Sequence, residues 1–283
     1  MGEVVKLDST FNLVRLSVID LHSHILPGID DGSPDLETSL AMARMAVADG
    51  IEVMACTPHF LPGRYENTTD DVRMRVAALN QKFVEEDIYL ALVVGADAHI
   101  RSDFLDCLKR HQILRLHDSR YVLFEPSHVM LPPQLEQQLS EIVAAGYVPI
   151  LTHPERFKWI ESNYTVFESL VKAGVWMQIT AGSLTGKFGP RPQYWAQKML
   201  TEGLVHLLAS DAHNTTSRPP ILSEAFAVAK LQIGLEEARH LTLTRPKAVL
   251  ENLAPEDCPP LPNFKNQTQP ISNWRKLFSR AKQ

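Results

Sequence analysis

The sequence predicts an α/β protein built on a parallel sheet, most simply a barrel closed by seven strands. Two observations lead to this prediction. Short apolar runs alternate with segments of helical spacing along most of the chain, and four of the runs begin at or just after a glycine that ends such a segment. The length of 283 residues suits one α/β barrel, which needs about 250 residues, or two small domains. An open doubly wound sheet is the alternative, but the strand number and the length favour the barrel.

Seven runs of β-branched and apolar residues give the predicted strands. They begin at Val18, Ile51, Ile88, Tyr121, Tyr147, Val175 and Val205. Residues 33–50 carry the clearest helix signals, with Ser33 as N-cap, Pro34 at the first helical position and Gly50 at the end. Residues 70–86 and 132–146 show similar helical spacing.

The predicted barrel spans residues 18–252, between an N-terminal extension (1–17) and a C-terminal tail (253–283). The tail is rich in Pro and Asn and ends in the basic segment WRKLFSRAKQ, where Trp274, Leu277 and Phe278 have helical spacing. A role at a partner or membrane surface is conceivable for this segment. A tail that folds back on the barrel or is disordered is the favoured interpretation.

Composition narrows the function classes. The net charge of −5 argues against broad nucleic-acid binding, which usually needs a basic face. The three cysteines are widely spaced and give neither a disulfide framework nor a CxxC zinc motif. The first residues lack the apolar core of a secretory signal, and no run of about 18 apolar residues can span a membrane. We therefore predict a soluble, cytoplasmic protein, either a monomer or a homo-oligomer.

Six of the seven predicted strands end in His, Asp or Glu. Because the carboxyl ends of parallel strands share one face, we expect these side chains to lie together. The candidates are His22, His24, His59, Asp97, Glu125, His153, Glu155, Asp211 and His213. The remaining strand ends in the small polar stretch Thr180–Ser183.

This pattern predicts a metal site with two or three ions. Residues i and i+2 of an extended strand point the same way, so His22 and His24 can bind one ion, and Asp211 and His213 can face one site. So many ionisable groups would be costly to desolvate without cations. Mixed imidazole and carboxylate ligands suit manganese, iron or zinc better than calcium. His99 and His128 follow candidate ligands closely and are expected, at most, to support them.

Arg156 and Arg218 follow two of these motifs, in HPER and after SDAH. Guanidinium groups pair well with phosphate oxygens, so both are candidate catalytic residues that contact an anionic substrate. The alternative is a salt bridge to a rim carboxylate such as Glu155.

The motifs HSH, TPH, GAD, FEP, THPER, ITAGSLTGKFG and ASDAHN occur in the order typical of the polymerase-and-histidinol-phosphatase (PHP) superfamily. LPGIDDG, THPER, AGSLTGKFG and SDAHN more closely resemble the bacterial metal-dependent protein-tyrosine phosphatases of capsule and exopolysaccharide operons. The resemblance covers roughly residues 19–252. It implies a distorted (β/α)7 TIM-like barrel that hydrolyses phosphomonoesters with divalent ions, manganese being favoured and iron or zinc possible.

The resemblance also implies a role for each site residue. The first ion is held by His22, His24 and Asp211. The second is held by Glu125 and His153, with Asp97 bridging the two ions. The third is held by Asp31, His59 and His213, Asp30 being the less favoured of the adjacent pair. The phosphate-contacting arginines match Arg156 and Arg218, and the implied partner is the phosphotyrosine-bearing tail of a bacterial tyrosine autokinase that controls polysaccharide synthesis.

Two features depart from the family pattern. The bridging position is commonly Glu, whereas this chain has Asp97, whose shorter arm is expected to shift the ions or the backbone. The HSH motif also lies farther from the initiator Met than usual.

Other functions fit these residues less well. A histidinol-phosphatase-like enzyme for small molecules shares the metal ligands, a nuclease would need a basic face, and a non-catalytic metal-binding regulator has only Asp97 in its favour. A cysteine-dependent phosphatase is excluded, because it needs Arg six residues after its Cys. Here those positions hold Pro62, Ile113 and Phe264.

Overall fold

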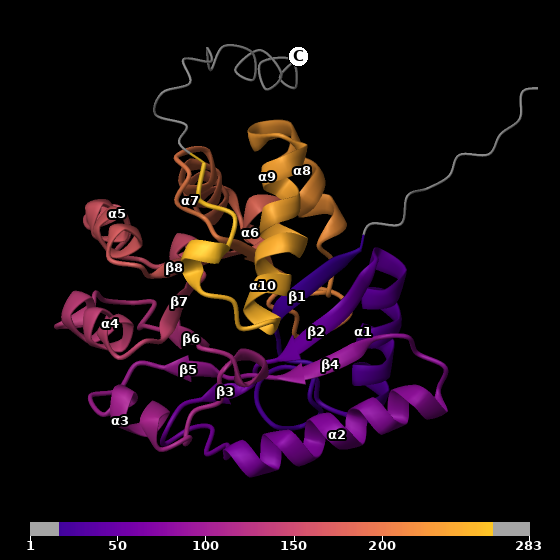
Figure 1. The fold of residues 1–283 in the computed structure, drawn as a ribbon. Coiled ribbons are helices and arrows are strands. Elements are labelled where there is room, and N and C mark those ends of the chain that lie inside the picture. Colours follow the sequence, from indigo (N-terminus) through magenta and orange to yellow (C-terminus); the bar gives the residue numbers. More distant parts are fainter. Residues whose placement is uncertain (1–16, 263–283) are drawn as a thin grey trace, which may run out of the picture.

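The computed structural model describes residues 17–262 (Figure 1). The segment WRKLFSRAKQ and all but the last residue of the predicted N-terminal extension lie outside the described residues. Within residues 17–262, no helix combines the length and the hydrophobicity needed to cross a membrane.

The described strands pair in parallel in two sheets. The first sheet has the order β1-β2-β4, formed by β1 (Val18–Ser23), β2 (Ile51–Cys56) and β4 (Ala91–Val94). The second has the order β3-β5-β6-β7-β8-β9, formed by β3 (His59–Phe60), β5 (Asp97–His99), β6 (Tyr121–Glu125), β7 (Val148–Thr152), β8 (Trp176–Thr180) and β9 (Leu207–Ala209). Each of the seven predicted runs contains one strand, and β3 and β5 are additional to them.

The two additional short strands are β3 and β5. They arise because two neighbouring predicted strands are each interrupted at the same level. β2 pairs with β4 and β3 pairs with β5, so the second pair continues the first after a short break. Pro58 lies in one break and has no N–H to donate to a neighbouring strand. Gly95 lies in the other, where an added Cβ would stand 2.9 Å from Thr57 Cγ2. The two strand segments approach each other too closely there for regular β-sheet hydrogen bonding.

Strands β1 and β9 join the two sheets at the other side. The His22 carbonyl accepts from the Asp211 amide at 2.9 Å, and the His24 amide donates to the Ala212 carbonyl at 2.8 Å. On its other side, β1 pairs with β2, and the register of that pairing shifts between Asp20 and Ser23, which distorts the barrel along β1. The predicted fold class, a distorted (β/α)7 barrel, is confirmed.

The helices lie outside the strands. Their bounds are α1 (Leu36–Asp49), α2 (Thr69–Glu85), α3 (Phe104–Lys109), α4 (Leu135–Ala144), α5 (Tyr164–Lys172), α6 (Ala181–Leu184), α7 (Pro190–Thr201), α8 (Ser223–Ile233), α9 (Leu235–Arg239) and α10 (Arg245–Leu250). In Figure 1, α2 runs beside the first sheet, and α3, α4 and α5 follow one another along the second. Their apolar faces form a large core with the outer sides of the strands.

The start of α1 differs from the prediction. Asp35, not Ser33, is the N-cap, and its carboxylate accepts from the Thr38 amide at 2.8 Å. The Ser33 hydroxyl instead donates to the Asp35 carbonyl at 2.9 Å, which places it outside the helix. The predicted end is correct: Gly50 adopts a left-handed conformation with φ of 94°.

A smaller apolar cluster fills the barrel and determines which side chains reach its mouth. On β6, Tyr121 and Leu123 belong to this inner cluster, so Glu125, two residues further on, also points inward. On β1, Ile19 and Leu21 are inner residues, whereas His22 and His24 are out of phase with them. The register shift in β1 lets both histidines face the mouth.

The first part of the predicted tail packs against the barrel. Cys258 is buried, with its sulfur 3.5 Å from the Tyr121 hydroxyl. The Arg245 guanidinium, itself fully buried, donates to the carbonyls of Pro259 and Pro260 at 2.9 and 2.7 Å. Residues 255–260 therefore cover the end of the barrel opposite to the rim that carries the histidines.

Candidate metal centre

The structure brings the nine predicted metal ligands to one rim of the barrel. They come from the ends of the strands and from the loops that follow β1, β7 and β9. All nine take part in groups whose possible ligand atoms lie within 4.8 Å of one another. The residues are His22, His24, Asp31, His59, Asp97, Glu125, His153, Asp211 and His213.

The first group contains His22, His24 and Asp211. The Nε2 atoms of the two histidines are 3.3 Å apart. The Asp211 Oδ1 atom lies 3.4 Å from the His22 Nε2 atom and 3.5 Å from that of His24. All three side chains are buried, so three donor atoms face one small space inside the protein.

Asp97 lies between this group and its neighbours. Its Oδ2 atom is 3.6 Å from the His22 Nε2 atom and 3.4 Å from the His59 Nδ1 atom. Asp97 also groups with His153 on one side and with Glu125 on the other. The short Asp side chain therefore reaches the ligand candidates on both sides, which is the placement that a bridging carboxylate needs.

Glu125 and His153 form the next group, and His128 joins it. The Glu125 Oε1 atom is 3.6 Å from the His153 Nε2 atom and 3.2 Å from the His128 Nε2 atom. The His99 Nδ1 atom is 3.4 Å from the other Glu125 oxygen. Sequence reasoning gave His128 only a supporting position, whereas here its ring lies as close to Glu125 as that of His153 does. Its place three residues after Glu125 is the signal that pointed to it.

The third group separates Asp31 from Asp30. The Asp31 Oδ1 atom lies 3.3 Å from the His59 Nε2 atom and 3.4 Å from the His213 Nε2 atom. The Asp30 carboxylate instead bonds the His24 Nδ1 atom at 2.7 Å, on the side of that ring away from the first group. It also accepts from the amide of Gly32. Asp31 thus faces the centre, and Asp30 orients a histidine from behind.

The donor set fits divalent metal ions. Buried polar atoms in proteins nearly always have a partner. In the described part of the chain, both Asp97 oxygens, the His59 Nδ1 atom and the His213 Nε2 atom are buried without a hydrogen-bond partner. All of these atoms face other ligand candidates, and mixed imidazole and carboxylate sites suit manganese, iron or zinc.

The electrostatics of the centre also favour a cation. Burial disfavours the charged form of His22, but the carboxylates of Asp211 and Asp97 outweigh burial and raise the pKa of His22 to about 9. Burial would raise the pKa of Asp211, but Arg218 and His22 hold it well below the usual range. The carboxylates are therefore ionised and stabilise positive charge between them.

Three further residues hold the ligands from outside, and sequence reasoning missed two of them. The Gln178 Oε1 atom is 2.8 Å from the His22 Nδ1 atom, which leaves Nε2 of that ring to face the centre. The Asp20 carboxylate accepts from the Ser210 amide at 3.0 Å and so ties β1 to the residue before Asp211. Asp30 contacts the His24 Nδ1 atom in the way that Gln178 contacts that of His22. A polar residue inside an apolar strand, as in DLHSH and WMQIT, was the available signal.

The two arginines converge on Asp211. The Arg156 Nη1 atom donates to the Asp211 Oδ2 atom at 2.7 Å, and the Arg218 Nη2 atom donates to the same oxygen at 2.5 Å. Glu155, the alternative partner considered from the sequence, is buried and accepts instead from the Thr180 amide. The arginines therefore stand beside the metal centre on one shared carboxylate.

Two candidate ligands have an unusual backbone. His153 and Asp211 follow β7 and β9 with φ of 37° and 52°, in the left-handed region that residues other than glycine rarely adopt. Such conformations cost free energy and persist where the surrounding structure enforces them, often at functional sites. Here they turn the chain sharply at the strand ends and place both side chains at the rim.

The fold and the rim together define a class, that of α/β barrels whose rim gathers histidines and carboxylates that could hold metal ions. Comparison with known proteins gives the family. The family model described as "Capsular polysaccharide synthesis, CpsB/CapC" matches residues 18–251, and the chain belongs to this family.

Individual relatives agree with this assignment. The chain is 36% identical over 261 residues to tyrosine-protein phosphatase YwqE of Bacillus subtilis, covering 92% of this chain and 99% of the relative. It is 30% identical over 240 residues to tyrosine-protein phosphatase CpsB of Streptococcus pneumoniae, covering 82% and 98%. A solved structure from work on YwqE and CpsB, described as unique metal-dependent tyrosine phosphatases, superposes with a TM-score of 0.82 at 36% identity, covering 86% of this chain and 98% of that one. The predicted family and its capsule branch are confirmed, and the predicted enzyme class is the one that these relatives' names state.

Proposed function

We propose that this protein is a metal-dependent protein-tyrosine phosphatase whose rim holds two or three divalent ions, with manganese as the first choice and iron or zinc as alternatives. One observation carries the proposal: eight buried or partly buried ligand candidates and the exposed Asp31 meet at one rim, and two arginines converge beside them. The names of the relatives support the reaction class.

Three sets of residues would hold the ions. They are His22, His24 and Asp211; Glu125 and His153 with His128 beside them; and Asp31, His59 and His213, with Asp97 between the sets. Bound there, divalent ions would lower the pKa of water and offset the charge of a phosphoryl group.

The arginines would bind the substrate phosphate. Each donates one N–H group to Asp211, which leaves other N–H groups of both guanidiniums for a ligand. The Arg218 Nε atom is buried and has no partner among the described residues. Phosphate oxygens would satisfy these donors and place the phosphorus atom next to the carboxylates and imidazoles of the centre, where the arginines stabilise charge on the transferred group.

The substrate would be a phosphotyrosine-bearing protein segment, most simply the tail of a tyrosine kinase that acts in polysaccharide synthesis. This part of the proposal is supported by the family to which the chain belongs and by the names of its relatives.

Phosphate release by the purified protein, with Mn²⁺ and with a chelator, tests the proposal. The substrates are a phosphotyrosine peptide, a phosphoserine peptide and histidinol phosphate. We expect chelator-sensitive release from phosphotyrosine, loss of at least about 100-fold in His213→Ala, and no change in His240→Ala, a matched substitution away from the rim. Preference for histidinol phosphate would assign a small-molecule phosphatase instead, and bound metal without any turnover would indicate a regulator.

A further inference from the structure

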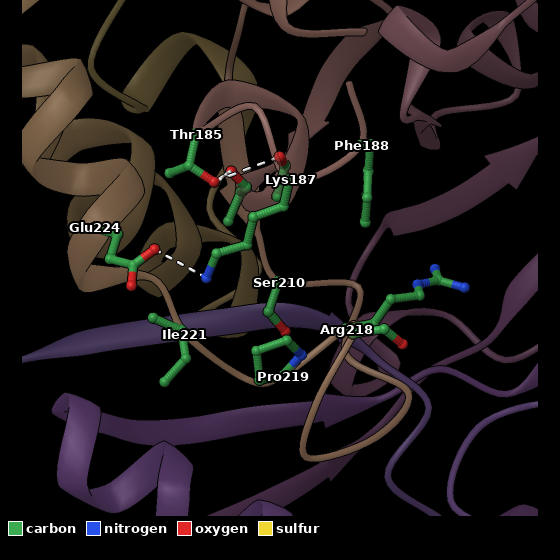
Figure 2. A pocket seen from close by; sticks show the side chains of 11 residues that line it. Thr185, Lys187, Phe188, Ser210, Arg218, Pro219, Ile221 and Glu224 are labelled. Carbon is green, nitrogen blue, oxygen red and sulfur yellow. Dashed lines mark hydrogen bonds and ion pairs between the residues drawn. The ribbon is translucent and has the colours of Figure 1, made fainter. Parts of the chain in front are cut away.

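The stretch AGSLTGKFG (residues 181–189) is one of the motifs that resemble the family, but it supplies no candidate metal ligand. It forms α6 and a tight turn after β8, closed by hydrogen bonds from the Lys187 amide to the Gly182 carbonyl at 2.8 Å and from the Gly186 amide to the Ser183 carbonyl at 3.1 Å. Figure 2 shows that this stretch walls one side of a small pocket, with the loop that carries Arg218 on the other side. The turn is therefore closed by its own backbone hydrogen bonds and adjoins the rim.

Phe188 is the residue of this stretch that meets the catalytic candidates. The Cζ atom of the Arg156 guanidinium lies over its ring, 5.3 Å from the ring centroid. The tip of the ring lies in the space that a side chain at position 182 would need. A Cβ on Gly182 would stand 3.0 Å from the Phe188 Cζ atom. The ring thus occupies a defined place between Gly182 and Arg156.

We infer that Phe188 is a positioning residue, which holds the Arg156 guanidinium in the orientation that binds phosphate. This inference rests on the proposed function. Arg156 has one ion-pair partner among the described residues, the Asp211 carboxylate, which fixes a single nitrogen. A long side chain held at one point keeps much of its rotamer freedom. The aromatic face restricts the plane of the guanidinium by a cation–π contact, and so directs its remaining N–H groups.

A double-mutant cycle between Phe188 and Arg156 tests the inference. In the parent protein, we expect Phe188→Ala to lower kcat/KM for a phosphotyrosine peptide about 3- to 30-fold, the range of one cation–π contact, and Phe188→Tyr to restore most of the loss. In an Arg156→Ala background, Phe188→Ala should cost nothing further, because the group it positions is gone. If the Phe188→Ala variant does not fold, Phe188→Leu replaces it in the cycle, because Leu keeps most of the side-chain volume but has no aromatic face.

Gly182→Ala provides a second, independent test of the inference. The new methyl group must displace the Phe188 ring, so we expect a loss in the same direction that disappears when Phe188 is already Ala. Tyr194→Ala is the matched control: this exposed aromatic residue follows on α7 and its loss should leave kcat/KM unchanged. Bound metal per protein should be equal in all variants.

Equal loss in both Arg156 backgrounds, or no loss in Phe188→Ala, would overturn the inference. The same cycle is read by calorimetric titration of the metal-loaded protein with inorganic phosphate. If the parent binds phosphate but does not hydrolyse phosphotyrosine, the proposed function fails while the titration still decides the role of Phe188. If the parent does not bind phosphate, both fail.

Discussion

At the scale of single residues, the centre depends on which side of each ring or carboxylate faces inward. His22 and His24 each present one ring nitrogen to the centre because Gln178 and Asp30 occupy the other. Such outer partners fix the orientation of a ligand and affect metal affinity although they do not bind the ion. The adjacent pair Asp30 and Asp31 shows the difference between the two roles most clearly.

Asn substitutions at this pair should have different effects. Asp31→Asn removes a charged donor that faces His59 and His213, so we expect one fewer ion per protein and nearly complete loss of activity. Asp30→Asn keeps the shape behind His24 and should weaken metal affinity about 10- to 100-fold without changing the number of ions at saturation. Metal analysis after dialysis and a Mn²⁺ titration measure both. A lost ion in Asp30→Asn but not in Asp31→Asn would reverse the two assignments.

At the scale of elements, β8 and β9 are held together below the centre by a buried histidine. His206, just before β9, accepts from the Met177 amide through Nδ1 at 3.1 Å and stacks on Trp176 with 4.9 Å between ring centroids. Burial, reinforced by the charge of Arg245, lowers the pKa of His206 well below its ordinary value. The ring is therefore neutral in the folded protein.

This arrangement makes the folded state sensitive to acid. The unfolded chain binds a proton at His206 below pH 6.5 and the folded chain does not, so stability is lost as the pH falls below that value. Each pH unit costs about 1.4 kcal/mol from this residue. His206→Asn keeps a hydrogen-bond acceptor but no titratable group. We expect the parent to lose more unfolding free energy than this variant between pH 7 and 5.5, by urea titration with chelator present. Parallel losses in the two proteins would contradict the prediction.

At the scale of the whole molecule, the barrel combines an apolar interior with a rim crowded with ionisable groups. The inner cluster and the cores under the helices stabilise the fold. The rim works against it, because buried carboxylates and imidazoles are costly to desolvate unless a cation offsets them. Bound metal should therefore contribute to the stability of the whole chain.

Removal of metal should lower Tm without unfolding the barrel at room temperature. A ligand that binds only the folded state adds about 2.7 kcal/mol at 100 times its Kd. We expect Mn²⁺ to raise Tm after chelation, and His22→Ala to show a smaller rise with a normal circular dichroism spectrum at 25 °C. His240→Ala should behave like the parent. A Tm that does not respond to Mn²⁺ would argue against a metal-bound rim.

The alternation of apolar runs and helical segments, with glycines between them, was enough to predict the barrel and its seven strand positions. The rule that parallel strands end at one face was enough to gather the ligand candidates except Asp31, since i and i+2 spacing and chain direction are local properties. Asp31 was named only through the family resemblance. The motifs were enough for the family. All of these depend on residues that are close in sequence.

Only the tertiary structure decided the rest. The two strands are interrupted beside Thr57 and Gly95, and this depends on how closely these two segments of the chain approach each other. The Asp211 partner of Arg156 and Arg218, the Gln178 contact to His22, and the place of Phe188 over Arg156 join residues that lie tens to more than a hundred positions apart in most cases. No periodicity or local motif encodes such pairs, because they form only where the folded barrel brings distant segments of the chain together.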